Sequence, residues 1–295
     1  HFGICGGCSL QHLDYARQLE SKGRIVAEQL ERLGRVVPDR WLPPLAGPAW
    51  SYRRRARLGC RYVLRKGRVL VGFRERSSPL LADLRGCEVL AGKTGQLIEP
   101  LAALIGGLTI MRRVPQVEVA VADNATALVL RALDAPSAAD LEALQAFERA
   151  HAVEIYLQTG GLETVAPVSP PGTPLRYELP GLPAGIRFAP TDFIQVNGEM
   201  NRRMIATALD LLSPRAADRA LDLYCGLGNF TLPLAQRVAE VTGVEGDAAL
   251  VARANGAGGQ HLEVAMLDVS VHFLWPDAMW NNTYVEHPSD MPDLA

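Results

Sequence analysis

The sequence lacks the features that would place a protein in a membrane or outside the cell. No apolar run approaches the roughly 20 residues of a membrane-spanning helix, and no basic stretch followed by an apolar segment opens the chain as in a secretory signal. Cysteine is scarce, and its five residues are an odd, unevenly spaced set that does not suit a disulfide framework. We therefore expect a cytoplasmic protein without a membrane partner, in which cysteine serves metal or thiol chemistry.

Basic residues are concentrated in one short segment, although the chain as a whole is nearly neutral. The formal net charge is -2, yet ten of the 30 lysines and arginines lie between residues 53 and 76, where Glu75 is the only acid. The ten are Arg53, Arg54, Arg55, Arg57, Arg61, Arg65, Lys66, Arg68, Arg74 and Arg76. Such a segment predicts a positive patch able to hold phosphates. The alternative is a solvated charged face without a ligand.

Residues 1–180 are predicted to form an α+β domain. After a loop rich in glycine and cysteine, apolar positions at helical spacing predict a helix over residues 11–34. Alternating basic and apolar residues around Lys66-Gly67 predict a hairpin from Tyr52 to Phe73. The remaining predicted elements are a hairpin from Val117–Val121 and Ala127–Leu133, a helix from Ser137 to Arg149 and a strand from Val153 to Leu157.

Residues 181–268 are predicted to form an incomplete α/β Rossmann-like domain. Strands at Ala220–Tyr224 and Glu240–Val244 alternate with helices at Asn229–Val238 and Ala248–Ala254, and Leu262–Asp268 could be a third strand. This order implies parallel strands with helices on the sheet faces. The boundary is placed in the loop from 167 to 183, which contains six prolines, and residues 269–295 are an atypical tail without periodicity.

A nucleotide-binding turn is predicted after the first strand of this second domain. Asp222 lies near the strand end and Gly226 and Gly228 follow, so that the backbone can turn sharply and approach a ligand. Glu245 ends the next strand, where an acid typically accepts hydrogen bonds from a ribose. Thr231 occupies the third glycine position of a dinucleotide fingerprint, which favours S-adenosylmethionine over NAD. An ordinary strand-to-helix turn is the alternative.

The Cys5-Gly6-Gly7-Cys8 segment is half of a possible metal site. Two thiolates at this spacing can bind one metal ion or one cluster, and glycines allow backbone N–H groups to approach the sulfurs. A redox dithiol and a structural zinc site are the alternatives, and spacing alone does not decide among the three.

Three short segments of the sequence resemble motifs of one known protein family and occur in the same order as in that family. Residues 1–12 resemble the cluster segment of RNA (uracil-C5)-methyltransferases that contain a [4Fe-4S] centre, and residues 192–197 and 222–230 resemble that family's cofactor motifs. The resemblance implies that Cys5, Cys8 and Cys87 are three of four cluster ligands, the first being expected before residue 1. Cys60 and Cys225 match no ligand and are expected to be structural.

The same resemblance implies how cofactor and substrate are bound. S-adenosylmethionine would contact Gln195, Tyr224, Asn229 and Glu245, with Asp268 near the adenine. The basic hairpin would hold phosphates of 23S rRNA, from which the target uracil is flipped out, and the enzyme would act as a monomer. It is left open whether the helix over 11–34 packs on the methyltransferase domain.

The resemblance also implies a covalent mechanism. Carbon 5 of uracil is a poor nucleophile, so a cysteine must first add to carbon 6, and a carboxylate must later remove the C5 proton. The family's Ser-Cys-Asn-Pro segment and its downstream glutamate are both missing here, so no catalytic residue is assigned. We expect a chain truncated at both ends and inactive by itself. The alternatives are a tRNA uracil-C5 methyltransferase, a non-catalytic RNA-binding remnant and an iron–sulfur electron carrier.

Overall fold

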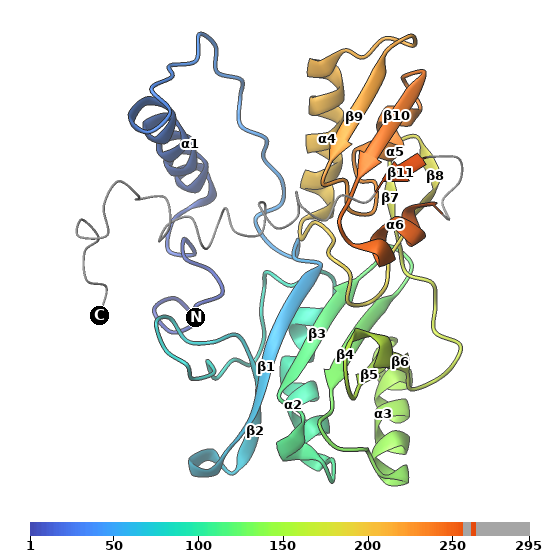
Figure 1. Ribbon diagram of the computed structural model, residues 1–295. Helices are drawn as coiled ribbons and strands as arrows, with labels where there is room; N and C mark the ends of the chain where they lie inside the picture. Colours follow the sequence, from blue (N-terminus) through green and yellow to red (C-terminus); the bar gives the residue numbers. More distant parts are fainter. Residues whose placement is uncertain (256–260, 264–295) are drawn as a thin grey trace, which may run out of the picture. The chain divides into compact units, whose positions relative to one another are not determined.

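The computed structural model describes residues 1–255 and 261–263, and its contacts divide the chain into two compact units (Figure 1). The first unit comprises His1–Tyr177 and Ala189–Met204, and the second comprises Glu178–Phe188 and the described residues from Ile205 onward. The chain thus enters the second unit, returns to the first and leaves it again. The sequence-based boundary at residue 180 did not anticipate this return.

A six-stranded sheet with strand order β2-β1-β3-β4-β5-β6 is the framework of the first unit. Neighbouring strands are antiparallel except for β4 and β5, which are parallel. The strands are β1 (Arg55–Val63), β2 (Arg68–Gly72), β3 (Gln116–Val121), β4 (Thr126–Arg131), β5 (Glu154–Gln158) and β6 (Ala166–Pro167). Both predicted hairpins are therefore confirmed.

The turn between β1 and β2 is determined by the local sequence. A short 3-10 helix, η1 (Leu64–Lys66), ends at Gly67, which has a left-handed φ of 63°. Glycine adopts this conformation without steric cost because it has no Cβ. The turn brings Val63 opposite Arg68 and sets the register of the hairpin.

Two helices, α2 (Ile98–Gly107) and α3 (Ala138–His151), contact each other and the sheet (Figure 1). Their apolar residues and those of β1 to β5 form one core, in which Leu58, Leu128 and Ile155 are fully buried. Helix α3 was predicted, whereas α2 was not, because Pro100 and the glycines at its end interrupt the helical pattern. Pro100 is tolerated since it lies in the first turn, where its missing N–H has no intrahelical acceptor.

The remaining elements of the first unit are short, apart from α1 (Tyr15–Arg32). Asp14 caps α1 by accepting a hydrogen bond from the Arg17 amide, and the helix has no buried residue. The short elements are η2 (Thr94–Leu97), η3 (Met111–Arg113) and η4 (Leu162–Thr164). The predicted helix over 11–34 is confirmed by α1.

The second unit contains a parallel sheet in the order β11-β10-β9, as the alternation of strands and helices predicted. Its elements are β9 (Arg219–Leu223), α5 (Thr231–Ala235), β10 (Glu240–Val244), α6 (Ala248–Asn255) and β11 (His261–Glu263). This is the β-α-β arrangement of a Rossmann-like domain. The suggested role of Asp268 and the atypical tail at 269–295 lie outside the described residues.

Two features of this region were missed by the sequence analysis. A hairpin of β7 (Arg176–Leu179) and β8 (Leu182–Arg187) lies where a loop from 167 to 183 was predicted, so that loop assignment is wrong in part. The six prolines of this segment favoured a loop prediction, although the four residues of β7 alternate between exposed and buried as in a strand. Helix α4 (Gly198–Leu212) follows and runs from the first unit into the second. No helix among the described residues is both long and apolar enough to cross a membrane.

Asp140 connects α3 to the segment after α2, and a prediction follows from its contacts. Its carboxylate accepts hydrogen bonds from the Thr109 amide at 2.7 Å, the Thr109 hydroxyl and the Ser137 amide at 2.9 Å. Because it is buried, Asp140→Asn should lower the free energy of unfolding by about 2 kcal/mol. The measurement is urea denaturation, and the control is Asp134→Asn, which breaks only an exposed pair with Arg113.

The same contacts predict a dependence on pH. Burial alone would raise the pKa of Asp140, but the hydrogen bonds from Thr109 and Ser137 outweigh it and the net pKa is lowered. Its stabilising contribution is therefore complete above the ordinary value of about 3.9 and is lost as the pH falls through the lowered pKa. The difference between wild type and Asp140→Asn should shrink in acid. A difference that grew as the pH fell would contradict the assignment.

Candidate functional site

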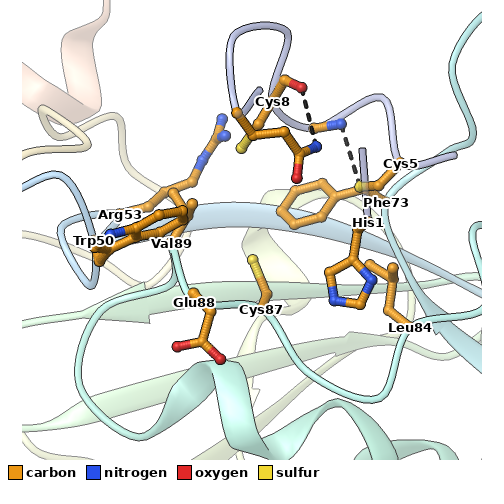
Figure 2. A pocket seen from close by; sticks show the side chains of 12 residues that line it. His1, Cys5, Cys8, Trp50, Arg53, Phe73, Leu84, Cys87, Glu88 and Val89 are labelled. Carbon is orange, nitrogen blue, oxygen red and sulfur yellow. Dashed lines mark hydrogen bonds between the residues drawn. The ribbon is translucent and has the colours of Figure 1, made fainter. Parts of the chain in front are cut away.

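Three cysteines from two distant segments of the sequence line one pocket of the first unit. Cys5 and Cys8 lie on the N-terminal loop, and the side chain of Cys87 points toward this loop from the segment after β2 (Figure 2). In the described part of the chain, no three His, Cys, Asp or Glu side chains are gathered as closely as a single metal ion requires. The pocket thus brings together the three predicted ligands without forming a closed metal site.

The N-terminal loop is attached to the chain that follows β2. The Gly6 amide donates to the Arg74 carbonyl at 2.8 Å, and the Arg76 amide donates to the Ile4 carbonyl at 2.8 Å. A Cβ on Gly6 would lie 3.1 Å from that Arg74 oxygen. The close backbone contact therefore requires a small residue between Cys5 and Cys8. The Gly7 amide also points at the Cys5 sulfur, 3.4 Å away.

Cys87 is held by a different glycine. The Cys87 amide donates to the Gly95 carbonyl at 3.0 Å, and a Cβ on Gly95 would lie 2.0 Å from the Cys87 carbonyl oxygen. No side chain fits at that distance, so a residue larger than glycine would displace the backbone of Cys87. The role of Gly95 was not predictable from the sequence, because nothing local distinguishes it from a turn glycine.

The surroundings of Cys8 in the pocket disfavour its thiolate form. Burial raises the pKa of Cys8, the nearby Cys87 and Cys5 thiols raise it further, and Arg53 partly opposes the shift. The Arg53 guanidinium also lies over the ring of Phe73, 5.6 Å from its centroid. A cation bound among the three sulfurs would remove this penalty, because a metal favours the deprotonated thiol.

The other two cysteines are buried, as expected of structural residues. Cys60 is buried in the sheet, and burial raises its pKa to about 12. Burial likewise raises the pKa of Cys225 to about 11. Neither thiol is a ready nucleophile, since reactivity depends on the thiolate.

Several arginines of the basic segment are paired with acids. Arg54 pairs with Asp123, and both Arg55 and Arg57 pair with Glu118, at 3.2 and 3.0 Å. Lys66 and Arg68 both pair with Asp83. At these five positions the positive charge is partly neutralised by acids from other parts of the chain, which the sequence pattern does not reveal. Phosphate binding by the basic segment stays a prediction.

Gln195 lies in the first unit, on the segment that leads into α4. Along this segment Asp192 and Ile194 are buried, whereas Phe193 and Gln195 are exposed. Val196 accepts a hydrogen bond from the Arg54 amide at 2.7 Å, and Asn197 forms a β-bridge with Arg53. The segment is thus attached to the start of β1.

The turn predicted to bind the cofactor, called the cofactor turn below, follows β9 in the second unit. Tyr224, Gly226 and Gly228 all have positive φ angles, of 61°, 57° and 86°. Two of these positions are glycines, for which such angles carry no steric penalty. Three positive angles within five residues make the sharp turn that the glycine spacing predicted.

Thr231 has a clear role at the position of the absent third glycine. Its side chain is fully buried, and its hydroxyl donates to the Asp222 carboxylate at 2.6 Å. Burial raises the pKa of Asp222, and this hydrogen bond opposes the rise. The threonine therefore holds the acid at the end of β9.

Glu245 connects the turns after two neighbouring strands. Its carboxylate accepts from the Gly226 amide at 2.8 Å, in the turn after β9. It also accepts from the Gly246 and Asp247 amides at 2.8 and 3.0 Å, in the turn after β10. Within the part of the chain that the structure describes, these three hydrogen bonds use three of the about four acceptor positions of a carboxylate.

The predicted cofactor residues therefore divide between the two units. Tyr224, Asn229 and Glu245 lie on the turns at the carboxyl ends of β9 and β10, where parallel sheets bind ligands. Gln195 lies in the first unit.

Comparison with known proteins gives the context of these sites. Residues 181–263 match the family model described as tRNA (Uracil-5-)-methyltransferase. A 23S rRNA (uracil(1939)-C(5))-methyltransferase RlmD from Nitrosococcus oceani is 48% identical, with all of this chain and 68% of the relative aligned. One from Nitrosospira multiformis is 42% identical over 98% of the chain and 68% of the relative. One from Alkalilimnicola ehrlichii is 52% identical over 86% and 57%.

A solved structure shares the fold. The Pyrococcus abyssi tRNA (uracil-54, C5)-methyltransferase, solved with S-adenosyl-L-homocysteine, superposes with a TM-score of 0.66 at 19% identity and covers 88% of this chain and 64% of its own. At that identity the likeness shows the fold alone. The identities of 42–52% to proteins of one name carry the assignment. The chain belongs to the RlmD family of 23S rRNA (uracil(1939)-C(5))-methyltransferases.

Proposed function

We propose that this chain provides the cofactor-binding and rRNA-binding parts of an S-adenosylmethionine-dependent 23S rRNA (uracil-C5)-methyltransferase. The observation that carries the proposal is the carboxylate of Glu245, which accepts hydrogen bonds from amides in both turns, after β9 and after β10, at the carboxyl edge of the parallel sheet. A ribose hydroxyl is the donor that suits this place at the carboxyl end of a parallel sheet. The family of the chain indicates the methyl donor and the rRNA substrate.

The remaining cofactor contacts are proposed on the same basis. Tyr224 would provide an aromatic wall, and Asn229 and Gln195 would offer side-chain amides. The bound cofactor would supply an electrophilic methyl group. The side chains named here would bind and orient it, with Thr231 keeping Asp222 in place.

We further propose that this chain binds substrate and cofactor but does not itself methylate uracil. Addition to carbon 6 requires a thiolate that faces the base. Cys225 is buried with its pKa raised to about 11, and it lies within the cofactor turn. Cys60 is buried in the first unit. The remaining three cysteines, Cys5, Cys8 and Cys87, line the pocket of Figure 2. None of the five suits the role of nucleophile.

The cysteine pocket offers three of the four ligands that a [4Fe-4S] cluster requires. Cys5, Cys8 and Cys87 would hold it, and the Gly7 amide near the Cys5 sulfur is the kind of donor that stabilises cluster sulfurs. A cluster presents a separate iron to each ligand, so it does not require the three sulfurs to converge on one metal ion. The cluster would link the N-terminal loop to the segment of Cys87.

For rRNA phosphates we propose the basic residues without an acidic partner. Arg61, Arg65, Arg74 and Arg76 are exposed, and no ion pair joins them to an acid within the described residues. Arg61 and Arg65 lie near the tip of the β1–β2 hairpin, and Arg74 and Arg76 follow β2. They replace Arg54, Arg55 and Arg57 as the expected contacts. A tRNA substrate is the alternative, and competition between 23S rRNA fragments and tRNA would decide.

The cofactor proposal predicts the effect of Glu245→Ala. The variant should weaken binding of S-adenosylhomocysteine by about 1–3 kcal/mol, since a hydrogen bond to a charged acceptor is lost and the two turns are released. Calorimetric titration is the measurement. Glu240→Ala, at the start of β10 and paired with the exposed Arg219, is the control. Equal affinities for the two variants would overturn the role of Glu245.

The cluster proposal predicts a difference between cysteines. After anaerobic reconstitution with iron and sulfide, Cys87→Ser should lose the visible absorbance of a cluster or retain only a small part of it. Cys60→Ala should keep the wild-type absorbance, because Cys60 is buried away from the pocket. Iron and sulfide analysis would accompany the spectra. Loss in both variants, or in neither, would contradict the assignment of Cys87.

The rRNA proposal predicts a change in salt dependence. Each phosphate contact to single-stranded RNA contributes about 0.7 to the slope of log affinity against log salt concentration. The double variant Arg61→Gln, Arg65→Gln should therefore lower the slope by about 1.4. Fluorescence anisotropy with a 23S rRNA fragment measures it. The control Arg113→Gln removes an arginine that pairs with Asp134 and should leave the slope nearly unchanged.

A further inference from the structure

Arg55 differs from the other arginines of the basic segment in what it contacts. Only 15% of its side chain is exposed, and its guanidinium pairs with Glu118 at 3.2 Å. It also donates to the Pro190 carbonyl and, at 3.1 Å, to the Thr191 carbonyl. Burial lowers its pKa, while Glu118 and Asp192 favour the charged form. A guanidinium presents several donors in a fixed plane, so one side chain can satisfy all these acceptors together.

These contacts fix the inner side of the segment that carries Gln195. Pro190 and Thr191 lie 135 and 136 residues away from Arg55 along the chain. The Asp192 carboxylate closes the local turn by accepting from the Ala189 amide at 2.6 Å. Because Asp192 and Ile194 are buried, the residues between and after them, Phe193 and Gln195, face outward.

We propose that Arg55 is a positioning residue for cofactor binding, which acts by holding residues 190–192 so that Gln195 keeps its outward orientation. The inference rests on the proposed function, in which Gln195 contacts the adenosyl cofactor. Arg55 would thus stabilise the protein's own chain, although the density of basic residues around it suggested phosphate binding. Its specific content is that Arg55 influences the cofactor only through Gln195.

Arg57 provides a matched control. It shares Glu118 with Arg55, at 3.0 Å, but its side chain is 71% exposed and donates to no carbonyl of the 189–197 segment. A variant of Arg57 therefore removes one positive charge and one bond to Glu118 while leaving the segment attached. Any difference between the two variants reports on the contacts to Pro190 and Thr191.

The test is a double-mutant cycle for binding of S-adenosylhomocysteine to the whole chain. Arg55→Gln should raise Kd about tenfold, and Gln195→Ala should have a comparable effect. The variant with both changes should bind no more weakly than Gln195→Ala alone, because Arg55 then has no partner to position. Arg57→Gln should stay close to wild type. Where Arg55→Gln does not fold, Arg55→Lys replaces it, since lysine keeps the charge but cannot span both carbonyls.

Amide hydrogen exchange separates this inference from the proposed function. Exchange over residues 191–197 should increase in Arg55→Gln and remain unchanged in Arg57→Gln. Independent effects of the two changes in the cycle, or equal effects of the Arg55 and Arg57 variants, would overturn the inference. If the wild-type chain bound no S-adenosylhomocysteine, the cofactor proposal would fail, and exchange alone would decide whether Arg55 holds the segment.

Discussion

The backbone of Arg53 and Arg54 is the constraint on which the first unit depends. The Arg53 amide donates to the Val89 carbonyl at 2.8 Å, and the Ala91 amide donates to the Arg53 carbonyl at 2.9 Å. The Arg54 amide donates to the Val196 carbonyl, and the Val121 amide donates to the Arg54 carbonyl. Two consecutive residues thus join the chain that follows Cys87, the central sheet and the segment of Gln195. These hydrogen bonds are nearly independent of side-chain identity, which leaves the side chains available for other contacts.

The elements with a clear local pattern were predictable, and those fixed by distant contacts were not. The hairpin at Lys66-Gly67 and the helix capped by Ser137 follow from turn and capping chemistry within a few residues. Helix α2 was missed because its proline and glycines weaken the periodic signal that indicates a helix. The parallel pairing of β4 with β5 depends on the connection through α3, which no local pattern specifies.

The candidate site shows the same division. The glycine spacing predicted the turn after β9, and the acid at the end of β10 proved to join two turns. The acidic partners of the β1 arginines were not predicted, because charge density in a sequence does not reveal whether a charge is neutralised. Glu118 lies 63 residues from Arg55, and only the antiparallel register of β1 and β3 brings them together. Gly95 remained unnoticed for a similar reason, since its contact with Cys87 forms only in the folded chain.

The return of residues 189–204 to the first unit has a consequence for the order of folding during synthesis. The carbonyls that satisfy the Arg55 guanidinium belong to Pro190 and Thr191, so the ribosome must release these residues before Arg55 can be buried with its partners. Until then β1, which is paired on both sides in the sheet, carries a charge with too few acceptors, and such a group favours the hydrated, open chain. The first unit therefore cannot reach its final packing when residue 177 emerges. It must wait for the hairpin of the second unit to be made, which couples the folding of the two units in time.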